Sequence, residues 1–254
     1  MKTYCLTDEL QNRFNRLREY RKNKVDFEGW EDTLYGKFVD YCDHNVVNLT
    51  HVNQYIRYCE TFKRIEPHID KSMHIAEAGG ASLIVQFLID YGFNCTVLEG
   101  DFRYEIISPN NSYDVLLSLE TLEHIKDQES NLIRDVAVFN FSGMKCYLAE
   151  MARVLTKNGL LFLTTPNANS FRVLYHWLNF RPPLMTHVHV RELTKSELWD
   201  LCQAHFDVME FTDMFCFGPI ESKVLEPFHK AVENLGGSTE NRGDDFFLML
   251  RNKV

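Results

Sequence analysis

The sequence predicts an α/β fold in which helices cover both faces of a doubly wound, mostly parallel sheet. Two observations predict it. Between residues 73 and 213, short apolar runs alternate with segments of helical periodicity. A turn of small residues follows the first apolar run, and an acidic residue closes the second. This alternation is typical of strand–helix–strand units, which build a parallel sheet.

Residues 1–70 are predicted to be mainly helical and to form a cap over the mouth of the sheet. Apolar residues recur there at helical spacing: Tyr55, Tyr58, Phe62 and Ile65. Residues 13–24 contain six basic residues against Glu19 alone. An apolar stripe favours a packed helix with a solvated basic face. A basic lip that attracts an anionic acceptor is the alternative.

Residues 73–100 are the most informative segment of the chain, because they combine a strand, a small-residue turn, a helix and a second strand. The turn contains Glu77, Gly79, Gly80 and Ala81. Glycines allow a ligand to approach the main chain, and Glu99 at the tip of the second strand could accept hydrogen bonds from a ribose diol. A tight turn that binds no ligand is the alternative.

Further elements follow in the order that a doubly wound sheet requires. Residues 113–120 and 160–167 read as buried strands, with an amphipathic helix over 147–155 between them. Residues 102–107 must supply one more strand, or the sheet loses it. Thr194 and Glu197 form a capping box before the next helix, and residues 206–211 are the sixth strand. Residues 214–243 are an excursion that contains a helix near 221–235, and residues 246–250 are the last strand.

The motif Glu77-x-Gly79-x-Ala81 resembles the first motif of class I S-adenosylmethionine-dependent methyltransferases, with Ala81 replacing the second glycine. A nicotinamide-binding loop would read G-x-G-x-x-G, whereas the run from Gly79 is G-G-A-S-L-I. The resemblance extends over residues 73–213 and favours the small-molecule or glycan branch. It implies a Rossmann-like sheet whose last strand is antiparallel and pairs with the sixth. The implied domains are a helical cap (1–70) and a cofactor-binding domain (71–254).

The resemblance implies S-adenosyl-L-methionine as cofactor and S-adenosyl-L-homocysteine as product. The residues expected around the methionine part are Glu77, Gly79, Gly80 and Ala81. Glu99 would hold the ribose, and Asp101 would reach the adenine side or replace Glu99. The end of the fourth strand would place backbone against the cofactor: Ser118, Leu119 and Glu120. All of these positions fall at the carboxyl ends of strands, where open α/β sheets bind ligands.

Histidines near two strand ends are candidate catalytic residues. His124 and His189 are the candidates for a general base that deprotonates a hydroxyl acceptor. If residues 186–190 are extended, His187 and His189 share a face. Small-RNA 2′-O-methyltransferases and ubiquinone-pathway O-methyltransferases use a motif similar to Glu120-x-x-Glu123-His124 for a metal. A divalent metal on Glu120, Glu123, His124 and His187 or His189 is therefore an alternative, although we favour a structural role or a base.

The acceptor is expected to be a small molecule or a glycan, methylated on oxygen. Residues after the fifth strand are expected to face it: Asn167, Asn169, Ser170, Arg172 and Tyr175. Two alternatives are a metal-dependent RNA 2′-O-methyltransferase and a non-catalytic scaffold that keeps the fold. The sequence determines neither the acceptor nor the oligomeric state.

Composition limits the possible partners. The net charge of −9 disfavours nucleic acid, since binding to phosphates requires clustered basic residues. The seven cysteines include no C-x-x-C pair, which favours reduced thiols over a zinc ribbon or a disulfide framework. The sequence shows no apolar run typical of a signal peptide or a transmembrane helix, so we expect a cytoplasmic protein.

Overall fold

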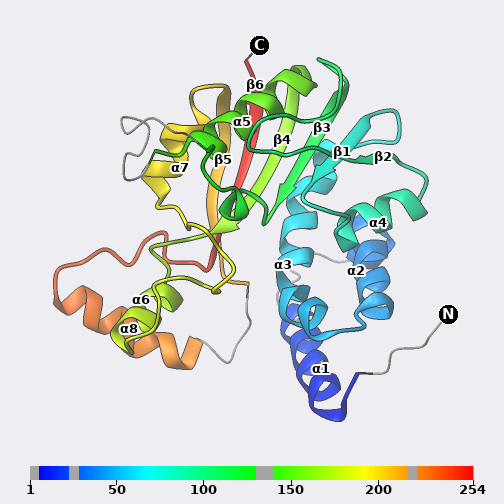
Figure 1. Ribbon diagram of the computed structural model, residues 1–254. Coiled ribbons are helices and arrows are strands. Elements are labelled where there is room, and N and C mark those ends of the chain that lie inside the picture. Colours follow the sequence, from blue (N-terminus) through cyan, green and yellow to red (C-terminus); the bar gives the residue numbers. More distant parts are fainter. Residues whose placement is uncertain (1–5, 23–28, 130–139, 217–221, 254) are drawn as a thin grey trace.

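The computed structural model describes residues 6–22, 29–129, 140–216 and 222–253. Six strands form one sheet in the order β2-β1-β3-β4-β6-β5 (Figure 1). Strands β1 to β4 pair in parallel, and β6 is antiparallel to both β4 and β5. The predicted mixed sheet with an antiparallel last strand is thus confirmed. The strands are β1 (His74–Ala78), β2 (Asn94–Val97), β3 (Tyr113–Leu119), β4 (Leu155–Pro166), β5 (Phe206–Met214) and β6 (Asp245–Asn252).

Several helices begin at a residue whose side chain caps the first turn. Ser82 caps α4, Ser170 caps α6 and Thr194 caps α7, each accepting a hydrogen bond from a backbone N–H of the first turn. The capping box of Thr194 and Glu197 is confirmed. The described helices are α1 (Asp8–Lys22), α2 (Leu34–Asn45), α3 (Leu49–Ile65), α4 (Leu83–Asp90), α5 (Ser142–Val154), α6 (Phe171–Leu178), α7 (Lys195–Cys202) and α8 (Ser222–Asn234).

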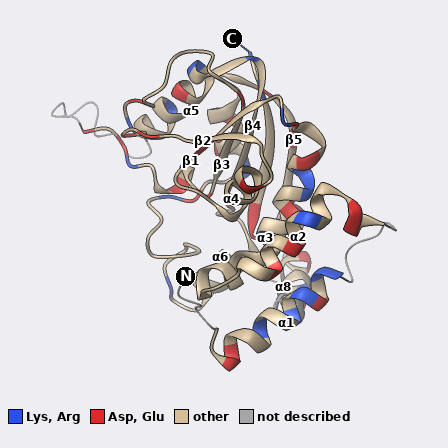
Figure 2. Ribbon diagram, turned by 90° about the vertical axis from the view of Figure 1, so that its right-hand side faces the viewer, with Lys and Arg blue, Asp and Glu red and all other residues tan. Residues whose placement is uncertain are grey.

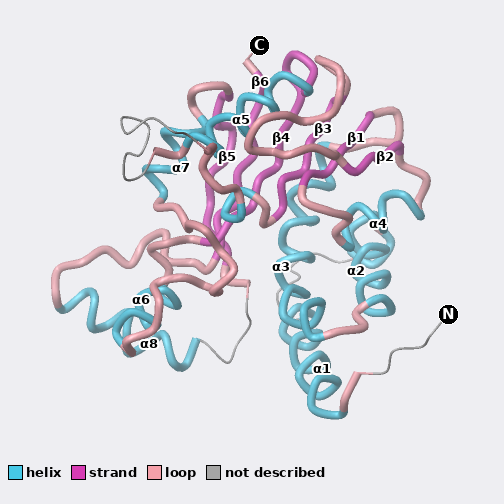
Figure 3. Tube along the Cα trace, viewed as in Figure 1, coloured by secondary structure: helices cyan, strands magenta, loops and turns pink. Residues whose placement is uncertain are grey.

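Two hydrophobic cores lie on opposite faces of the sheet. Successive strand residues point to opposite faces, so Val115 and Leu117 pack in one core and Leu116 in the other. The first core joins the sheet to α1–α4, and the second joins it to α5 and α7. Figure 3 shows α1–α3 gathered beyond β1–β3, and α6 with α8 beyond the ends of β5 and β6. The layers are those of a doubly wound fold.

Residues 102–107 form no strand. The sheet therefore lacks the additional strand that this segment was expected to supply or lose. The backbone groups of this segment bond elsewhere: the Ile106 N–H donates to the Glu150 carboxylate (2.9 Å), and Arg153 on α5 donates to the carbonyls of Ile106 and Ser108. These α5 side chains satisfy the groups that a neighbouring strand would otherwise bind. Strand β2 is therefore an edge of the sheet.

Helix α1 is less solvated on its basic side than the sequence predicts. Arg21 is buried, donates to the Tyr55 hydroxyl (2.7 Å) and lies 5.0 Å from the centre of the Trp30 ring. Arg18 pairs with Asp43 at 2.8 Å. Lys24 lies outside the described residues. Figure 2 shows both acidic and basic residues along α1, so this helix presents no uniform basic surface.

Phe87 on α4 tests whether the N-terminal helices and the sheet share one core. Its ring is fully buried and lies 5.2 Å from Phe38 on α2 and 5.4 Å from Phe62 on α3. We expect Phe87→Ala to lower the free energy of unfolding by about 3–5 kcal/mol, measured by urea denaturation. Ile89→Ala on the same helix is the control, because Ile89 is 48% exposed. Equal losses in the two variants would contradict a shared core.

Candidate functional site

The candidate site lies where the chain reverses its direction across the sheet. From β1 the chain passes outward to β2 and then returns to β3 on the other side of β1, so the loops after β1 and β3 diverge. Such switch points form ligand crevices at the carboxyl ends of strands. A cavity of about 230 Å³ lies there, lined by the loop after β1, the end of β3, Thr164 of β4 and α3.

The loop after β1 leaves its main chain open to this cavity. Gly79 has φ +96°, and a Cβ there would lie 2.2 Å from Oγ1 of Thr121, so only glycine fits. The Thr121 hydroxyl donates a hydrogen bond to the Ala78 carbonyl at 3.0 Å, which stabilises the turn. A Cβ on Gly80 would meet nothing within 4 Å. A bound molecule can therefore contact the backbone at Gly80.

Glu77 supports the turn from inside the protein. Its carboxylate is buried and accepts a hydrogen bond from the Ser82 N–H at 2.7 Å, where α4 begins. Burial raises the pKa of Glu77 to about 7, although the hydrogen bonds from Ser82 oppose this shift. The carboxyl group thus ties β1 to the start of α4.

The cavity contains buried oxygen atoms that find no hydrogen-bond partner in the described part of the chain. They are Oγ1 of Thr61, Oγ1 of Thr164 and Oε1 of Glu120, and all three residues line the cavity. Buried polar atoms are normally bonded. These atoms, together with the open backbone at Gly80, fit a polar ligand such as the amino-acid part of S-adenosylmethionine.

Arg57 of α3 connects the N-terminal helices to the site. Its Nη1 lies 2.5 Å from Oε2 of Glu120, which follows β3 in the left-handed conformation (φ 55°). Burial lowers the pKa of Arg57, but Glu120 and Asp245 outweigh this effect and raise it. Because the guanidinium stays charged, it holds the end of β3 against α3.

A second cavity of about 410 Å³ adjoins the first and shares Gln54, Arg57 and Glu120 with it. Glu123 lines this cavity and is fully buried. Its Oε2 accepts a hydrogen bond from the Thr165 hydroxyl at 3.0 Å, whereas its Oε1 has no hydrogen-bond partner among the described residues and lies 3.9 Å from Nε2 of His124. Burial, and then the charge of Glu120, raise the pKa of Glu123 well above its usual range. The wall of this cavity therefore contains acidic groups that few positive charges balance.

The two candidate catalytic histidines meet in the second cavity. The rings of His124 and His189 lie 5.0 Å apart, and both residues line the cavity. His189 Nδ1 lies 2.6 Å from Oε1 of Glu192, and both side chains are buried. Burial, and then the neighbouring His189, lower the pKa of His124. The contact with Glu192 fixes the orientation of the His189 ring.

One ligand atom each of Glu123, His124 and His189 lies within 4.8 Å of the others, a spacing that a divalent ion could bridge. This set differs from the alternative metal ligands that the sequence offered. Glu120 pairs with Arg57 instead, and His187 is exposed because residues 186–190 form turns, not an extended strand. The unpartnered Oε1 of Glu123 and the Glu192 contact behind His189 fit a metal ligand set.

The expected cofactor residues divide into two groups. Six of them line the first cavity: Glu77, Gly79, Gly80, Ala81, Leu119 and Glu120. Ser118 does not, because its hydroxyl accepts from Tyr147 of α5 at 2.8 Å on the other side of the sheet. Glu99 and Asp101 are exposed beyond β2. Asp101 pairs with Arg103 at 2.7 Å, whereas the Glu99 carboxylate has no partner among the described residues.

The expectation that Asn167, Ser170 and Tyr175 face the acceptor is wrong, because their side chains make other contacts. The Asn167 amide donates to the carbonyls of Asn241 and Gly243, and the Ser170 hydroxyl caps α6. The Tyr175 ring packs against Phe228 of α8 at 5.7 Å. These contacts anchor α6 and the segment before β6.

Sequence reasoning missed Arg57, Asp245 and Glu192. Arg57 had a usable signal, because it is a charged residue within the apolar stripe of α3. Asp245 stands at the start of an antiparallel strand, so the rule for the carboxyl ends of parallel strands did not include it. Its pairing with Pro166 at the end of β4 brings it to the site edge.

No protein-family model matches this sequence, and no curated protein sequence is significantly similar to it. Solved structures, however, share its architecture. The fold is that of the S-adenosylmethionine-dependent methyltransferases. One such enzyme from Archaeoglobus fulgidus superposes with a TM-score of 0.50 at 11% identity, covering 79% of this chain and 97% of that one. Another, from Thermotoga maritima, has a TM-score of 0.50 at 14% identity, covering 88% and 100%. A Pyrococcus horikoshii protein gives 0.50 at 12% identity, covering 90% and 100%.

The raised pKa of Glu77 predicts a pH dependence of stability. Between pH 4.5 and about 7 the folded protein retains a proton that the unfolded chain has released, so the free energy of unfolding falls as the pH rises. The neighbouring Tyr58 and Cys95 have raised pKa values and do not titrate in this interval. By pH 8 the free energy of unfolding should have fallen by up to about 3 kcal/mol less in Glu77→Gln than in the wild type.

The measurement is urea unfolding of both proteins, without cofactor, at pH 5 and pH 8. Because other buried carboxyl groups also contribute, the difference between the two proteins is the quantity to compare. Parallel pH profiles for the wild type and Glu77→Gln would show that Glu77 titrates normally.

Proposed function

We propose that the protein is an S-adenosylmethionine-dependent methyltransferase. One observation supports this most directly: a cavity lies at the switch point, at the carboxyl ends of β1 and β3. It has an open glycine backbone and three buried oxygens that have no hydrogen-bond partner among the described residues. This is the edge at which open α/β sheets bind nucleotide-like ligands. The fold shared with known methyltransferases supports the same function.

In this proposal the two parts of the cofactor bind in different surroundings. The cavity of about 230 Å³ is smaller than most ligand pockets and suits the methionine part. The adenosine would extend along the exposed end of β2, where the carboxylate of Glu99 is free to accept the ribose hydroxyls. Asp101 is less suited to this role, because its carboxylate is already bound to Arg103.

The residues around the cavities provide positioning and proton transfer. S-adenosylmethionine supplies a methyl group on a sulfonium, which is already activated for displacement. Tyr58 and Gln54 of α3 line the cofactor cavity and help to exclude water, and we propose that α1–α3 act as a cap in this way. His189 would accept the acceptor proton at Nε2, since its Nδ1–H donates to Glu192. Glu192 is then a positioning residue.

We propose a small molecule or sugar as the acceptor, methylated on oxygen, bound in the second cavity. The shared wall of Gln54, Arg57 and Glu120 makes that cavity the neighbour of the cofactor. The histidine base also lies there. Binding next to the cofactor would convert the transfer into a reaction between two pre-oriented groups.

Cofactor binding tests this proposal directly. We expect S-adenosylmethionine and S-adenosylhomocysteine each to bind one site per chain in isothermal titration calorimetry. Glu99→Ala should weaken binding by about 1–3 kcal/mol, because charge-assisted hydrogen bonds to the ribose are lost. Asp101→Ala is the matched control and should change affinity little. If a folded wild-type protein binds neither molecule, the proposed function is wrong; a loss confined to Asp101→Ala would exchange the two roles.

A metal-dependent methyltransferase, including one that acts on RNA 2′-hydroxyls, is the second candidate. The cluster of Glu123, His124 and His189 favours a metal. The RNA acceptor gains little support, because Arg21 is buried and Arg18 is paired with Asp43.

Manganese binding separates the two candidates. For a metal-dependent enzyme we expect Mn²⁺ to bind one site, detected by calorimetry, and His124→Gln to weaken binding at least tenfold. His176→Gln is the control, because His176 lies on α6 and its ring bonds the Leu184 carbonyl, outside the cluster. Absence of saturable Mn²⁺ binding would leave His189 as a base without a metal.

A further inference from the structure

The wall of the second cavity contains more hydrogen-bond acceptors than the protein supplies donors for. Asp245 is 1% exposed, and neither of its carboxylate oxygens accepts a hydrogen bond of normal geometry in the described part of the chain; the thiol of Cys216, a weak donor, is close enough to act on its pKa. Oε1 of Glu120, Oε1 of Glu123 and Oδ1 of Asn53 likewise have no hydrogen-bond partner among the described residues. All four residues line this cavity. A polar ligand that donates hydrogen bonds would satisfy these atoms.

The charges around the cavity are also unbalanced. Three carboxyl groups line it, but Arg57 is the one Lys or Arg among its described lining residues. Arg57 is bound to Glu120 at 2.5 Å, so Asp245 and Glu123 only share its charge and have no Lys or Arg of their own among the described lining residues. Burying a carboxylate without a counter-charge is costly. Burial, and then the charge of Glu120, accordingly raise the pKa of Asp245 well above its usual range.

We propose that the second cavity binds a protonated amine of the acceptor, with its N–H groups directed at Asp245 and the neighbouring acceptor oxygens. An ammonium group has three hydrogen-bond donors and one positive charge. It would supply both the donors and the positive charge that this wall lacks. The inference rests on the proposed function, because it treats this cavity as the acceptor site beside the cofactor.

Other occupants fit the same wall less well. A divalent ion would be held by the converging atoms of Glu123, His124 and His189, a group that includes neither Asp245 nor Asn53. A neutral polyol would supply donors but no charge. A phosphate or carboxylate would meet three acidic side chains and one guanidinium already engaged with Glu120.

The proposed contact also limits which atom receives the methyl group. An ammonium held by carboxylates keeps its proton and has no lone pair, so it cannot attack a methyl group. The amine is therefore an anchor, and the reacting atom is a second nucleophile of the same acceptor. A hydroxyl nucleophile would need a base, which His189 can provide. The acceptor class is thus an amino alcohol, a class that includes amino sugars.

Two probes that differ in one charged group test the proposal. We would titrate 4-amino-1-butanol and 1,4-butanediol into protein saturated with S-adenosylhomocysteine, following binding by ligand-observed NMR. The amino alcohol should bind at least tenfold more tightly than the diol. Asp245→Asn should reduce its affinity at least tenfold, since this isosteric change removes the negative charge.

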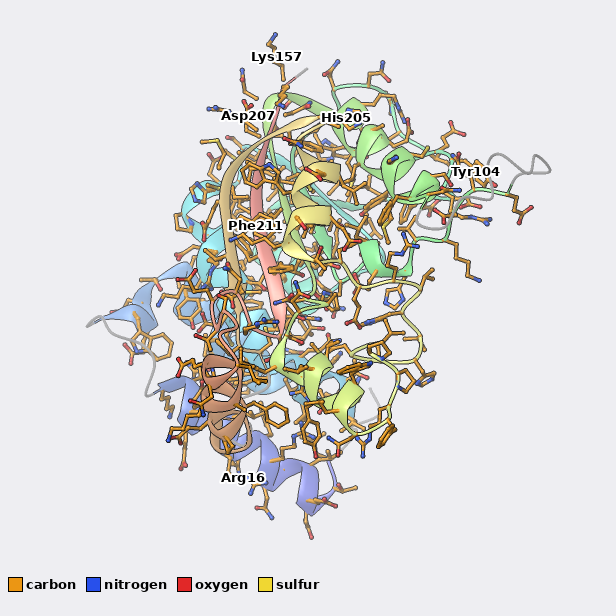
Figure 4. The ribbon with its side chains drawn as sticks, turned by 90° about the vertical axis from the view of Figure 1, so that its left-hand side faces the viewer. Arg16, Tyr104, Lys157, His205, Asp207 and Phe211 are labelled. Carbon is orange, nitrogen blue, oxygen red and sulfur yellow. The ribbon has the colours of Figure 1, made fainter. Side chains whose placement is uncertain are left out.

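Asp207→Asn is the matched control. Asp207 is an exposed residue near the start of β5 and pairs with Arg251 at 3.6 Å (Figure 4). This variant should bind the amino alcohol like the wild type. If Asp245→Asn does not fold, Asn53→Ala on α3 tests the same wall and should also weaken binding.

The outcomes separate this inference from the proposed function. Equal affinity for the two probes, no binding of the amino alcohol, or unchanged binding in a folded Asp245→Asn variant would overturn the inference. Displacement of the amino alcohol by Mn²⁺ alone would favour a metal in its place and also count against it. Binding of S-adenosylhomocysteine, measured separately in each variant, shows whether the cofactor site, and with it the proposed function, survives.

Discussion

The site is organised around one buried guanidinium. Arg57 extends from α3 to the end of β3 and bonds Glu120 at 2.5 Å, while the charge of Asp245 on β6 also acts on it. A guanidinium remains protonated even when it is buried, and its planar set of donors fixes the geometry of its partners. Without it, the carboxyl groups of Glu120, Glu123 and Asp245 would line one cavity with no Lys or Arg among its described lining residues. The ion pair therefore sets the position of α3 over the sheet and the shape of both cavities.

This arrangement gives the N-terminal helices a part in both cavities. Helix α3 lines the first cavity with Tyr58 and Thr61, and the second with Thr50 and Asn53. The same helix packs its apolar side into the core that it shares with α4 and the sheet. One helix thus buries hydrophobic area on one side and presents polar groups on the other.

No helix in the described part of the chain is long and apolar enough to cross a membrane.

The loss of a strand after β2 changes the edge of the sheet without disturbing the crevice. Arg153 and Glu150 of α5 bond the backbone of residues 106–108, and this substitutes for strand pairing. Glu99 and Asp101 lie in the exposed stretch before it. The crevice itself depends on β1 and β3, which remain paired at the centre of the sheet.

The sequence by itself determined the order of the elements and the strand–turn–helix unit around Gly79, because these depend on local periodicity and on residues that only particular turns accept. The antiparallel last strand was implied by the resemblance to class I methyltransferases, and the structure confirms it. It also identified six residues of the first cavity and both histidines of the second. The tertiary structure decided which distant side chains meet. The ion pair of Arg57 with Glu120, and the gathering of the buried carboxyl groups of Asp245 and Glu123 in one cavity wall, depend on how α3 and β6 pack against β3. Ion pairs between residues far apart in the chain leave no periodic pattern in the sequence, so only the tertiary packing determines them.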